Sequence, residues 1–392
     1  MNQQQLSQTF NEVFETADPP RFFFAPGRIN LIGEHTDYNG GHVFPAAISF
    51  GTYAAAKKRS DQKLRFYSLN FPEEGVIECE LSDLSHNPDH SWANFPKGMI
   101  HLFSENGFPL PCGMDVLFSG NIPNGAGLSS SASIEMATGV VLEGLFDFAI
   151  DRLKMIQLGQ KVENDYIGVN SGIMDQFAIG KGKKDFAMLL DCQTLDFRYA
   201  PVDLGEHEIV IINSNKQRTL AGSKYNERRA ECEQALADIR TEVSVTSLGE
   251  LTSEQFEKVK HLIQDETNVK RAKHAVYENE RTLLALEELE RGNLQKFGKL
   301  MNESHISLRD DYEVTGAELD AIAETAWHFP GVIGARMTGA GFGGCAIAIV
   351  HQAQVENFKE QLTQKYTEAF GYAPSFYEAK ISDGAKELTE EF

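Results

Sequence analysis

Cysteine is scarce in this sequence and carries no sign of a function. The 392 residues include five cysteines, which are far apart and odd in number: Cys79, Cys112, Cys192, Cys232 and Cys345. No C-x-x-C pair occurs, and no Cys/His cluster has the spacing of a zinc site. We therefore expect idle or buried thiols in a reducing compartment, and we exclude a disulfide framework and cysteine-based chemistry.

Basic charge is also in short supply. The formal net charge is -21, from 57 acidic and 36 basic residues. Nucleic acid and anionic membranes need basic surface, because binding there releases counterions from phosphate groups. The charge balance therefore argues against both as main partners. It leaves room for an anionic small ligand, because a few backbone amides and a metal ion can hold a phosphate locally.

Long apolar segments are absent as well. No run approaches the roughly 18 residues of a membrane helix, and residues 1–20 have neither the basic nor the apolar region of a signal peptide. We expect a soluble cytoplasmic protein with no membrane partner. Hydrophobic residues make up 42% of the chain, which is enough for sizeable cores, and the length allows two or three domains.

The pattern of the sequence changes near its middle. The first half reads as short strands separated by turns, and a period of 3.6 residues from Ser129 predicts a helix. A strand is expected from His207 onward, followed by long, charged helical segments. We place a domain boundary between residues 195 and 210, which gives an N-terminal domain of residues 1–200 and a C-terminal domain of residues 201–392. Strands and helices mix without regular alternation, so the predicted fold class is α+β.

A short box of charged residues, GRINLIGEHTDYNGG, spans residues 27–41. It places Arg28, Glu34, His35 and Asp37 among glycines, directly after an apolar run. Such crowding of polar groups suits three kinds of site: a metal site, an acid–base site, or a surface that binds a hydroxyl-rich ligand. The residues of the box alone leave all three open.

A glycine-serine loop, PNGAGLSSSAS, follows at residues 123–133. Its glycines leave backbone amides uncovered, and the helix that begins there presents free N–H groups and a positive dipole end. Both features suit phosphate, and the serine hydroxyls can reach a magnesium ion. No lysine follows, so the loop is not a Walker A motif, and Ser130 stands where a dinucleotide fingerprint needs glycine. A glycine turn with a serine cap is the alternative.

Two further segments are less informative by themselves. GAGFGG, residues 339–344, fits G-x-G-x-x-G, but it runs into a β-like segment, so a tight glycine loop is expected. In VENDYIGVNSGIMDQFAIG, residues 162–180, Glu163 is typical of a solvated helix face and Asp175 of a turn or a helix cap. Neither acid stands out alone.

The order of these four segments resembles the galactokinase family, which belongs to the GHMP superfamily of small-molecule kinases. The box resembles the signature of that family. The serine loop, SGIMDQ and MTGAGFGG resemble the phosphate loop, the central acidic region and the C-terminal glycine loop of the superfamily. The resemblance covers roughly residues 20–350. It implies two α+β domains, the first similar to domain 2 of ribosomal protein S5 and the second ferredoxin-like, with the active site between them.

The resemblance also implies a reaction, the transfer of the γ-phosphoryl group of MgATP to the anomeric hydroxyl of α-D-galactose. The products would be galactose 1-phosphate and ADP, in the first committed step of galactose catabolism. Asp175 is implied as the catalytic acid/base and Arg28 as its partner. The implied galactose ligands are Glu34, His35, Thr36, Asp37, Gly172 and Tyr225. The implied ATP-binding residues are Ser68, Gly125, Ala126, Gly127, Leu128, Ser129, Ser130 and Ser131, and the implied magnesium ligands are Ser131 and Glu163.

Three alternatives stay open beside this interpretation. A related kinase would act on N-acetylgalactosamine or another sugar, which the volume of the pocket decides. A non-catalytic sugar sensor of the same fold should have a damaged phosphate loop or a lost base, whereas GLSSSAS, Asp175 and Arg28 are intact here. An NAD-dependent oxidoreductase would depend on GAGFGG, whose context argues against it. We expect a monomer, and the sequence, which has no heptad array, does not exclude an oligomer.

Overall fold

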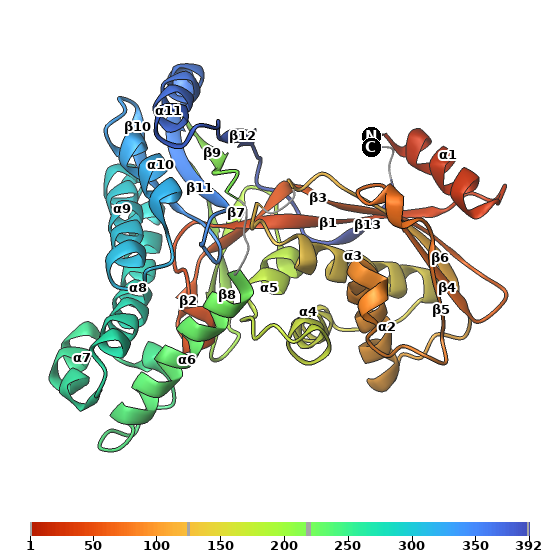
Figure 1. Ribbon diagram of the computed structural model, residues 1–392, viewed down its shortest axis with the longest axis horizontal. Coiled ribbons are helices and arrows are strands. Elements are labelled where there is room, and N and C mark those ends of the chain that lie inside the picture. The colour runs from red at the N-terminus through yellow and green to blue at the C-terminus, as the bar shows by residue number, and fades with distance from the viewer. Residues whose placement is uncertain (1, 124–125, 217–220, 390–391) are drawn as a thin grey trace.

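The computed structural model describes residues 2–123, 126–216, 221–389 and 392, with residues 221–223 described by their backbone alone. The molecule is elongated, and its elements gather in two halves that the long strands β1 and β3 connect (Figure 1). One half contains α1 to α4 and β4 to β6, and the other contains α6 to α11 and β9 to β12. None of the helices in these described ranges combines the length and the apolar character that crossing a membrane requires.

The largest sheet has six strands in the order β13-β1-β3-β6-β4-β5. Neighbouring strands are antiparallel, except β4 and β6, which are parallel. The register of β1 against β3 shifts between Pro26 and Gly27, where β3 carries two extra residues, Ser49 and Phe50, so the regular pairing is interrupted just before Arg28. The strands are β1 (Arg21–Asn30), β3 (Pro45–Lys58), β4 (Lys63–Ser68), β5 (Ile77–Glu80), β6 (Met114–Gly120) and β13 (Lys386–Leu388).

Helices cover both faces of this sheet. α1 packs on one face, and α2 to α5 lie on the other (Figure 1). Buried residues occur along almost the whole of α3, as expected of a helix at the centre of a core. The helix predicted from Ser129 is thereby confirmed, and it begins at Ser130. The helices are α1 (Gln3–Phe14), α2 (Asn94–Glu105), α3 (Ser130–Phe146), α4 (Arg152–Lys161) and α5 (Met174–Lys181).

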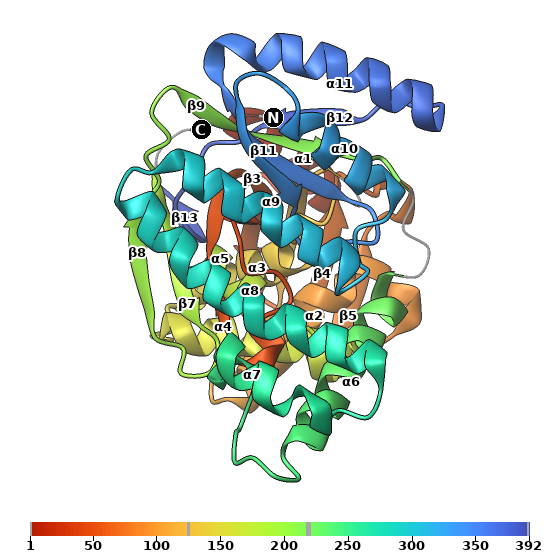
Figure 2. The same ribbon diagram turned by 90° about the vertical axis from the view of Figure 1, so that its left-hand side faces the viewer.

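The second sheet has the order β10-β11-β9-β12, with all neighbours antiparallel. Two predicted strands, one from His207 and one after GAGFGG, are confirmed as β9 and β11. The helices α8 and α9 pack side by side and cross the front of the view in Figure 2. The strands are β9 (His207–Asn213), β10 (Val332–Met337), β11 (Cys345–His351) and β12 (Ser375–Glu378), and the helices are α6 (Ala221–Ile239), α7 (Ser253–Val259), α8 (Glu266–Glu290), α9 (Leu294–Asp310), α10 (Ala317–Trp327) and α11 (Val355–Phe370).

A third, small sheet connects the charged box to the rest of the fold. Its order is β2-β7-β8, formed by β2 (His42–Val43), β7 (Phe186–Asp191) and β8 (Phe197–Pro201). β2 begins directly after the box, so β7 anchors that end of it. The predicted mixture of strands and helices is confirmed. The division at residue 200 stays a prediction, to which the structure adds that β13, near the end of the chain, pairs with β1 near its start.

Candidate active site

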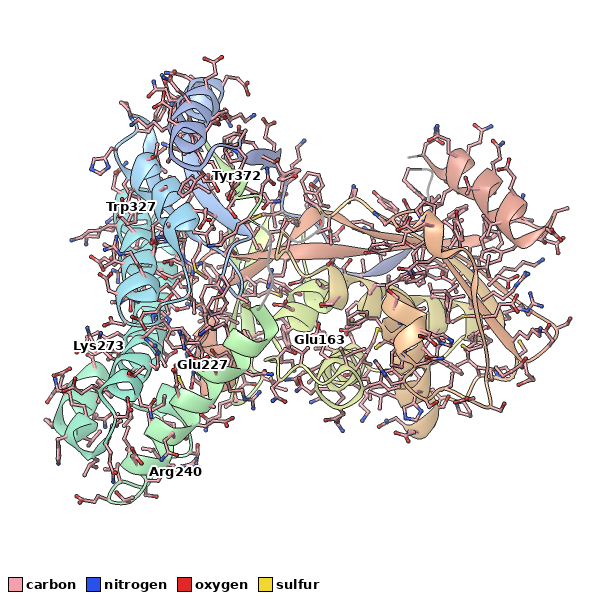
Figure 3. All side chains as sticks on the ribbon, viewed as in Figure 1. Glu163, Glu227, Arg240, Lys273, Trp327 and Tyr372 are labelled. Carbon is pink, nitrogen blue, oxygen red and sulfur yellow. The ribbon has the colours of Figure 1, made fainter. Side chains whose placement is uncertain are left out.

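The polar segments singled out in the sequence meet in one cavity, whose volume is about 340 Å³. β1 supplies Arg28 before it ends at Asn30, and the box then runs to β2 with only a short 3-10 turn at Asp37–Asn39. Glu163, which lines the cavity, lies near the middle of the molecule (Figure 3). The walls also include Glu34, His35, Gly127, Ser129, Ser130, Ser131, Gly172, Asp175 and Tyr225.

Arg28 and Asp175 form a bidentate ion pair on the cavity wall. Arg28 Nε and Nη2 donate to the two carboxylate oxygens of Asp175 at 2.9 Å each, and Nη1 donates to the Gly127 carbonyl at 2.8 Å. Ser129 Oγ also donates to Asp175 Oδ2. The Arg28 side chain is 5% exposed and that of Asp175 is 27% exposed. The hydrogen bonds from Arg28 and Ser129 therefore fix the position of the carboxylate, while part of it stays accessible to a ligand.

Glu34 is the buried acid of the box. Its Oε1 accepts a hydrogen bond from the Gly339 N–H at 2.7 Å and from Arg336 Nη1 at 3.4 Å. Burial raises the Glu34 pKa, and the charges of Arg336 and Arg28 oppose that rise. β10 and the glycine loop that follows it therefore hold this carboxyl group in place.

Asp37 is an acid whose pKa is shifted into the neutral range by its surroundings. Burial, together with the charge of Asp175, raises the Asp37 pKa to about 7. Hydrogen bonds from the backbone of Tyr38 and Met174 oppose the rise. At neutral pH Asp37 is therefore divided between its neutral and charged forms, and a ligand that prefers one form selects it.

His35 has a left-handed backbone with φ 61°, which is uncommon outside glycine. Burial lowers its pKa to about 3, so the ring is neutral at neutral pH. Nε2 lies 3.2 Å from the Ala340 carbonyl and therefore carries the proton, whereas Nδ1 accepts from the Tyr38 hydroxyl at 2.7 Å. The Tyr38 oxygen in turn accepts from Tyr312 at 2.8 Å. These bonds select one tautomer, and the Tyr225 ring packs against His35 with centroids 5.6 Å apart.

The serine loop and the central acidic segment meet at two oxygen donors. Ser129, with φ 63°, directly precedes α3, which begins at Ser130. Ser131 Oγ donates to Glu163 Oε1 at 2.6 Å, and Glu163 lies in a π-helical turn, Val162–Ile167. Glu163 is 8% exposed, and burial raises its pKa.

Ser131 and Glu163 are the candidate ligands of a magnesium ion. No group of three or more metal-binding His, Cys, Asp or Glu side chains occurs in the part of the chain that the structure describes. Mg²⁺ keeps several waters and commonly binds one or two carboxylates together with substrate phosphates, so a complete protein cage is not required. The hard oxygen donors of Ser131 and Glu163 fit such an ion when phosphates supply the other ligands.

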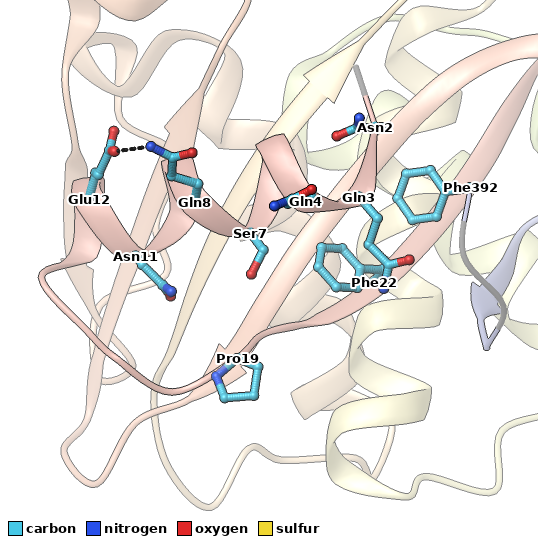
Figure 4. A pocket seen from close by; sticks show the side chains of 10 residues that line it. All are labelled: Asn2, Gln3, Gln4, Ser7, Gln8, Asn11, Glu12, Pro19, Phe22 and Phe392. Atoms are coloured by element: carbon cyan, nitrogen blue, oxygen red, sulfur yellow. Dashed lines mark hydrogen bonds between the residues drawn. The ribbon is translucent and has the colours of Figure 1, made fainter.

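A larger cavity lies elsewhere, along the N-terminal helix α1 (Figure 4). Its volume is about 860 Å³, but its described walls carry one acid and no basic side chain. They consist of Asn2, Gln3, Gln4, Ser7, Gln8, Asn11, Glu12, Pro19, Phe22 and Phe392. The smaller cavity, with its converging charged groups, is therefore the candidate active site.

Comparison with known proteins agrees with this placement. Residues 8–58 match the galactokinase galactose-binding signature, residues 94–183 the N-terminal domain of GHMP kinases, and residues 285–368 their C-terminal domain. A galactokinase of Ligilactobacillus salivarius is 57% identical over 389 residues, which are 99% of this chain and 100% of that protein. The chain belongs to the galactokinase family.

Further relatives of the galactokinase family and fold agree. A galactokinase of Lactiplantibacillus plantarum is 55% identical over 388 residues, covering 99% of this chain and 100% of that protein. The crystal structure of Lactococcus lactis galactokinase complexed with galactose has a TM-score of 0.97 at 53% identity, over 98% of this chain and 99% of that one. A mevalonate kinase of Methanococcus jannaschii, at 18% identity and a TM-score of 0.67 over 94% of this chain and 100% of that one, shares the fold. The predicted family and the two-domain GHMP kinase fold are confirmed.

Not every galactokinase-family residue predicted from the sequence lines the cavity. Thr36 Oγ1 lies 2.6 Å from the His42 carbonyl and 2.9 Å from the Gly33 carbonyl, so its single O–H is directed at the backbone, and the side chain is buried. Gly125 lies outside the described residues. Other predicted ATP contacts that the described cavity wall does not include are Ser68, Ala126 and Leu128. The ligand-binding roles of all these residues stay predictions.

Sequence reasoning missed Arg336, which helps to hold the galactokinase-family site together. Arg336 is fully buried in β10, and its Nη1 donates to the Asn30 carbonyl at 2.9 Å as well as to Glu34. A lone arginine in an apolar strand that leads into MTGAGFGG was the available signal, because such a residue is rarely buried without a partner. Ser129, predicted as an ATP contact, also binds Asp175 directly.

Proposed function

We propose that this chain transfers the γ-phosphoryl group of MgATP to the anomeric hydroxyl of α-D-galactose, giving α-D-galactose 1-phosphate and ADP. The observation that carries the proposal is the Arg28–Asp175 ion pair in a cavity lined by both the charged box and the serine loop. Membership of the galactokinase family supports the proposal, as does the galactose complex of the similar Lactococcus lactis protein.

Asp175 is suited to receive the proton of the attacking hydroxyl. A sugar hydroxyl is a weak acid, and a carboxylate within hydrogen-bond reach accepts its proton as the oxygen bonds to the γ-phosphorus. The bond from that phosphorus to the bridging oxygen breaks, and ADP leaves. Arg28 stays protonated and cannot act as the base, but its charge beside Asp175 stabilises the negative charge that develops on the reacting oxygens.

The serine loop is suited to bind the triphosphate. The first amide groups of α3 have no partner within the helix, and the positive end of the helix dipole attracts anions. Ser130 is exposed, so its hydroxyl can donate to a phosphate oxygen. Ser131 and Glu163 would hold Mg²⁺, which neutralises phosphate charge when bound.

Fixed acceptors are suited to select the sugar. Every sugar hydroxyl can donate one hydrogen bond, and Glu34 and Asp37 present carboxyl oxygens in the cavity wall. An epimer that leaves one of these acceptors unpaired loses about 1–3 kcal/mol of binding free energy. We assign to Asp37 the recognition of the hydroxyls that distinguish galactose from glucose.

ADP release from the purified protein with MgATP and a panel of sugars tests the proposed function. Galactose should give the highest kcat/KM, above N-acetylgalactosamine, arabinose and glucose. A preference for N-acetylgalactosamine would make the chain a related sugar 1-kinase. Folded protein that binds galactose and ATP without releasing ADP would be a sugar sensor, and either result would overturn the proposal.

The close packing of Gly172 against Asp37 gives a prediction for the sugar site. A Cβ atom at Gly172 would lie 1.8 Å from Asp37 Oδ2 and 2.2 Å from Asp37 Cγ. Because contacts this short displace the Asp37 side chain, we expect Gly172→Ala to raise the galactose KM about tenfold or more and to leave the ATP KM nearly unchanged. Steady-state kinetics check this. Gly120→Ala, whose Cβ atom would make ordinary contacts from 3.5 Å outward, is the control. An unchanged galactose KM in Gly172→Ala would contradict the prediction.

Removing the charge of Glu163 gives a prediction for the metal. Glu163→Gln keeps the size of the side chain but offers a neutral, weaker ligand beside Ser131. We expect the magnesium concentration for half-maximal activity to rise about tenfold. A magnesium titration of the initial rate measures it, with Asp165→Asn, exposed on the same π-helical turn, as the control. Equal magnesium dependence in Glu163→Gln and the wild-type protein would exclude Glu163 as a ligand.

A further inference from the structure

Helix α8 carries a row of buried polar side chains that no step of the proposed reaction uses. The row consists of His274, Glu278, Asn279 and Thr282, whose spacing places them on one face of the helix. All four are buried, and the most exposed of them, Asn279, is 5% exposed. Buried polar groups need hydrogen-bond partners. Three of the partners of this row belong to the charged box or are the residue that follows it: Gly33, Glu34 and His42.

Glu278 binds the backbone of the box directly. Its Oε1 accepts from the Gly33 N–H at 3.0 Å and from Ser304 Oγ at 2.5 Å, and its Oε2 accepts from Arg281. The side chain is 0% exposed. Burial alone would raise its pKa, but the charge of Arg281 and the neighbouring His274 overcome that effect and lower the pKa to about 2. Glu278 is therefore a carboxylate at neutral pH.

The neighbours of Glu278 on α8 bind the box on both sides of that contact. His274 Nε2 donates to the Glu34 carbonyl at 3.0 Å, and Asn279 Oδ1 accepts from the His42 N–H at 2.7 Å. Gly33 has φ +93°, and a Cβ atom there would lie 2.8 Å from a side-chain oxygen of α8. The box therefore lies against α8 with no space for a side chain at this point.

These contacts matter because the box, once β1 has ended at Asn30, contains only a short 3-10 turn to bind its own backbone. Glu278 holds the N–H of Gly33 and His274 holds the carbonyl of the next residue, Glu34. The two bonds hold the peptide groups on either side of the Gly33–Glu34 segment, and with them the direction in which the Glu34 side chain leaves the backbone. That side chain lines the cavity, so the contacts of α8 with the backbone, together with Arg336 and Gly339, which bind the carboxyl group itself, set the position of this group.

We propose that Glu278 is a positioning residue for galactose recognition, which holds Glu34 at the sugar through the backbone of Gly33. The inference depends on the proposed function, since it concerns the sugar site of that reaction. The affinity for galactose thus depends on α8, whose residues are about 240 positions away from the box in the chain. Glu278 touches neither the phosphate loop nor the Arg28–Asp175 pair in the described contacts, so ATP binding should not depend on it.

The test uses Glu278→Gln, which keeps the size of the side chain but loses one acceptor. A carboxamide has one oxygen, whereas Glu278 uses one oxygen for Gly33 and Ser304 and the other for Arg281. In either orientation its NH₂ group faces a donor. We expect the galactose KM to rise about tenfold, and further in Glu278→Ala, while the ATP KM stays within about twofold. Glu287→Gln, exposed on the same helix, is the matched control.

Thermal melting and circular dichroism establish which variants are folded. If Glu278→Ala does not fold, the two KM values of Glu278→Gln alone test the positioning role. A rise confined to the galactose KM supports the positioning role. An unchanged galactose KM, or an equal rise in both KM values, overturns it. If the wild-type protein shows no galactose-dependent ADP release, the proposed function fails instead, and calorimetric titration of galactose into wild-type and Glu278→Gln protein then tests the role of Glu278 by the same criteria.

Discussion

Asp175→Asn is expected to lower kcat about 10²- to 10⁴-fold while galactose still binds. Asparagine has nearly the size of aspartate, but a carboxamide cannot take up the proton of the attacking hydroxyl. Its NH₂ group would also face the donors of Arg28 or Ser129, which now converge on the carboxylate. The loss should therefore appear in kcat more than in the galactose KM. Steady-state kinetics and calorimetric titration of galactose measure the two quantities separately.

Asp196→Asn is the matched control for this experiment, because it makes the same substitution at an exposed position outside the cavity. It should keep the wild-type kcat. A near-normal kcat in Asp175→Asn would exclude Asp175 as the base. Loss of galactose binding as large as the loss of rate would make Asp175 a sugar ligand in place of a proton acceptor.

Asp37→Asn is expected to have the second large effect, a galactose KM about tenfold to a hundredfold higher and a weaker preference for galactose over glucose. The carboxyl group is enclosed by the box, Gly172 and the start of α5. A sugar hydroxyl that donates a hydrogen bond to it therefore finds no other acceptor nearby when the carboxyl group is replaced. The ratio of kcat/KM for the two sugars measures the discrimination. A ratio equal to that of the wild-type protein would show that other residues distinguish the epimers.

The same residue predicts how galactose binding depends on pH. Burial and the charge of Asp175 raise the Asp37 pKa to about 7, so the carboxylate form is lost as the pH falls below that value. Because the carboxylate is the stronger acceptor, galactose affinity of the wild-type protein should fall between about pH 8 and about pH 6. Asp37→Asn, which does not titrate, should bind with lower and more nearly constant affinity across that range.

Stability of the sugar-free protein should respond in the opposite direction. The pKa of Asp37 is about 7 in the folded state, against 3.8 for an ordinary aspartate, so the folded protein keeps a proton that the unfolded chain releases. This residue therefore lowers the free energy of unfolding as the pH rises from about 4 to about 7. The melting temperature of Asp37→Asn, relative to the wild-type protein, should rise across that window. A melting-temperature difference between Asp37→Asn and the wild-type protein that stays constant from about pH 4 to about pH 7 would contradict the assignment.

Local patterns in the sequence predicted the elements that carry the site. The apolar run before Arg28 became β1, the period after Ser129 became α3, and the apolar segment after GAGFGG became β11. Each of these predictions depends on residues that are close together in the chain, where alternation and helical periodicity report directly on burial.

The charged helices of the second half show where such patterns stop. The segment AVYENERTLLALEELE reads as a helix with many solvated charges, and the structure confirms the helix as part of α8. The sequence pattern does not reveal that Glu278 is fully buried against Gly33, whereas Glu287 on the same helix is exposed. Glutamate at either position has the same local signature, so only the packing of α8 against the box distinguishes the two.

By itself the sequence determined the family, several of the strands and helices, and the residue types that suit a sugar and a phosphate. Only the tertiary structure decided which of those residues meet. Arg28 and Asp175 are 147 residues apart, and Glu34 and the Gly339 amide that binds it are 305 apart. The Asp37 pKa, the tautomer of His35 and the partners of Glu278 likewise depend on burial and on distant groups. Such properties arise from the folded surroundings of a side chain, which no local pattern records.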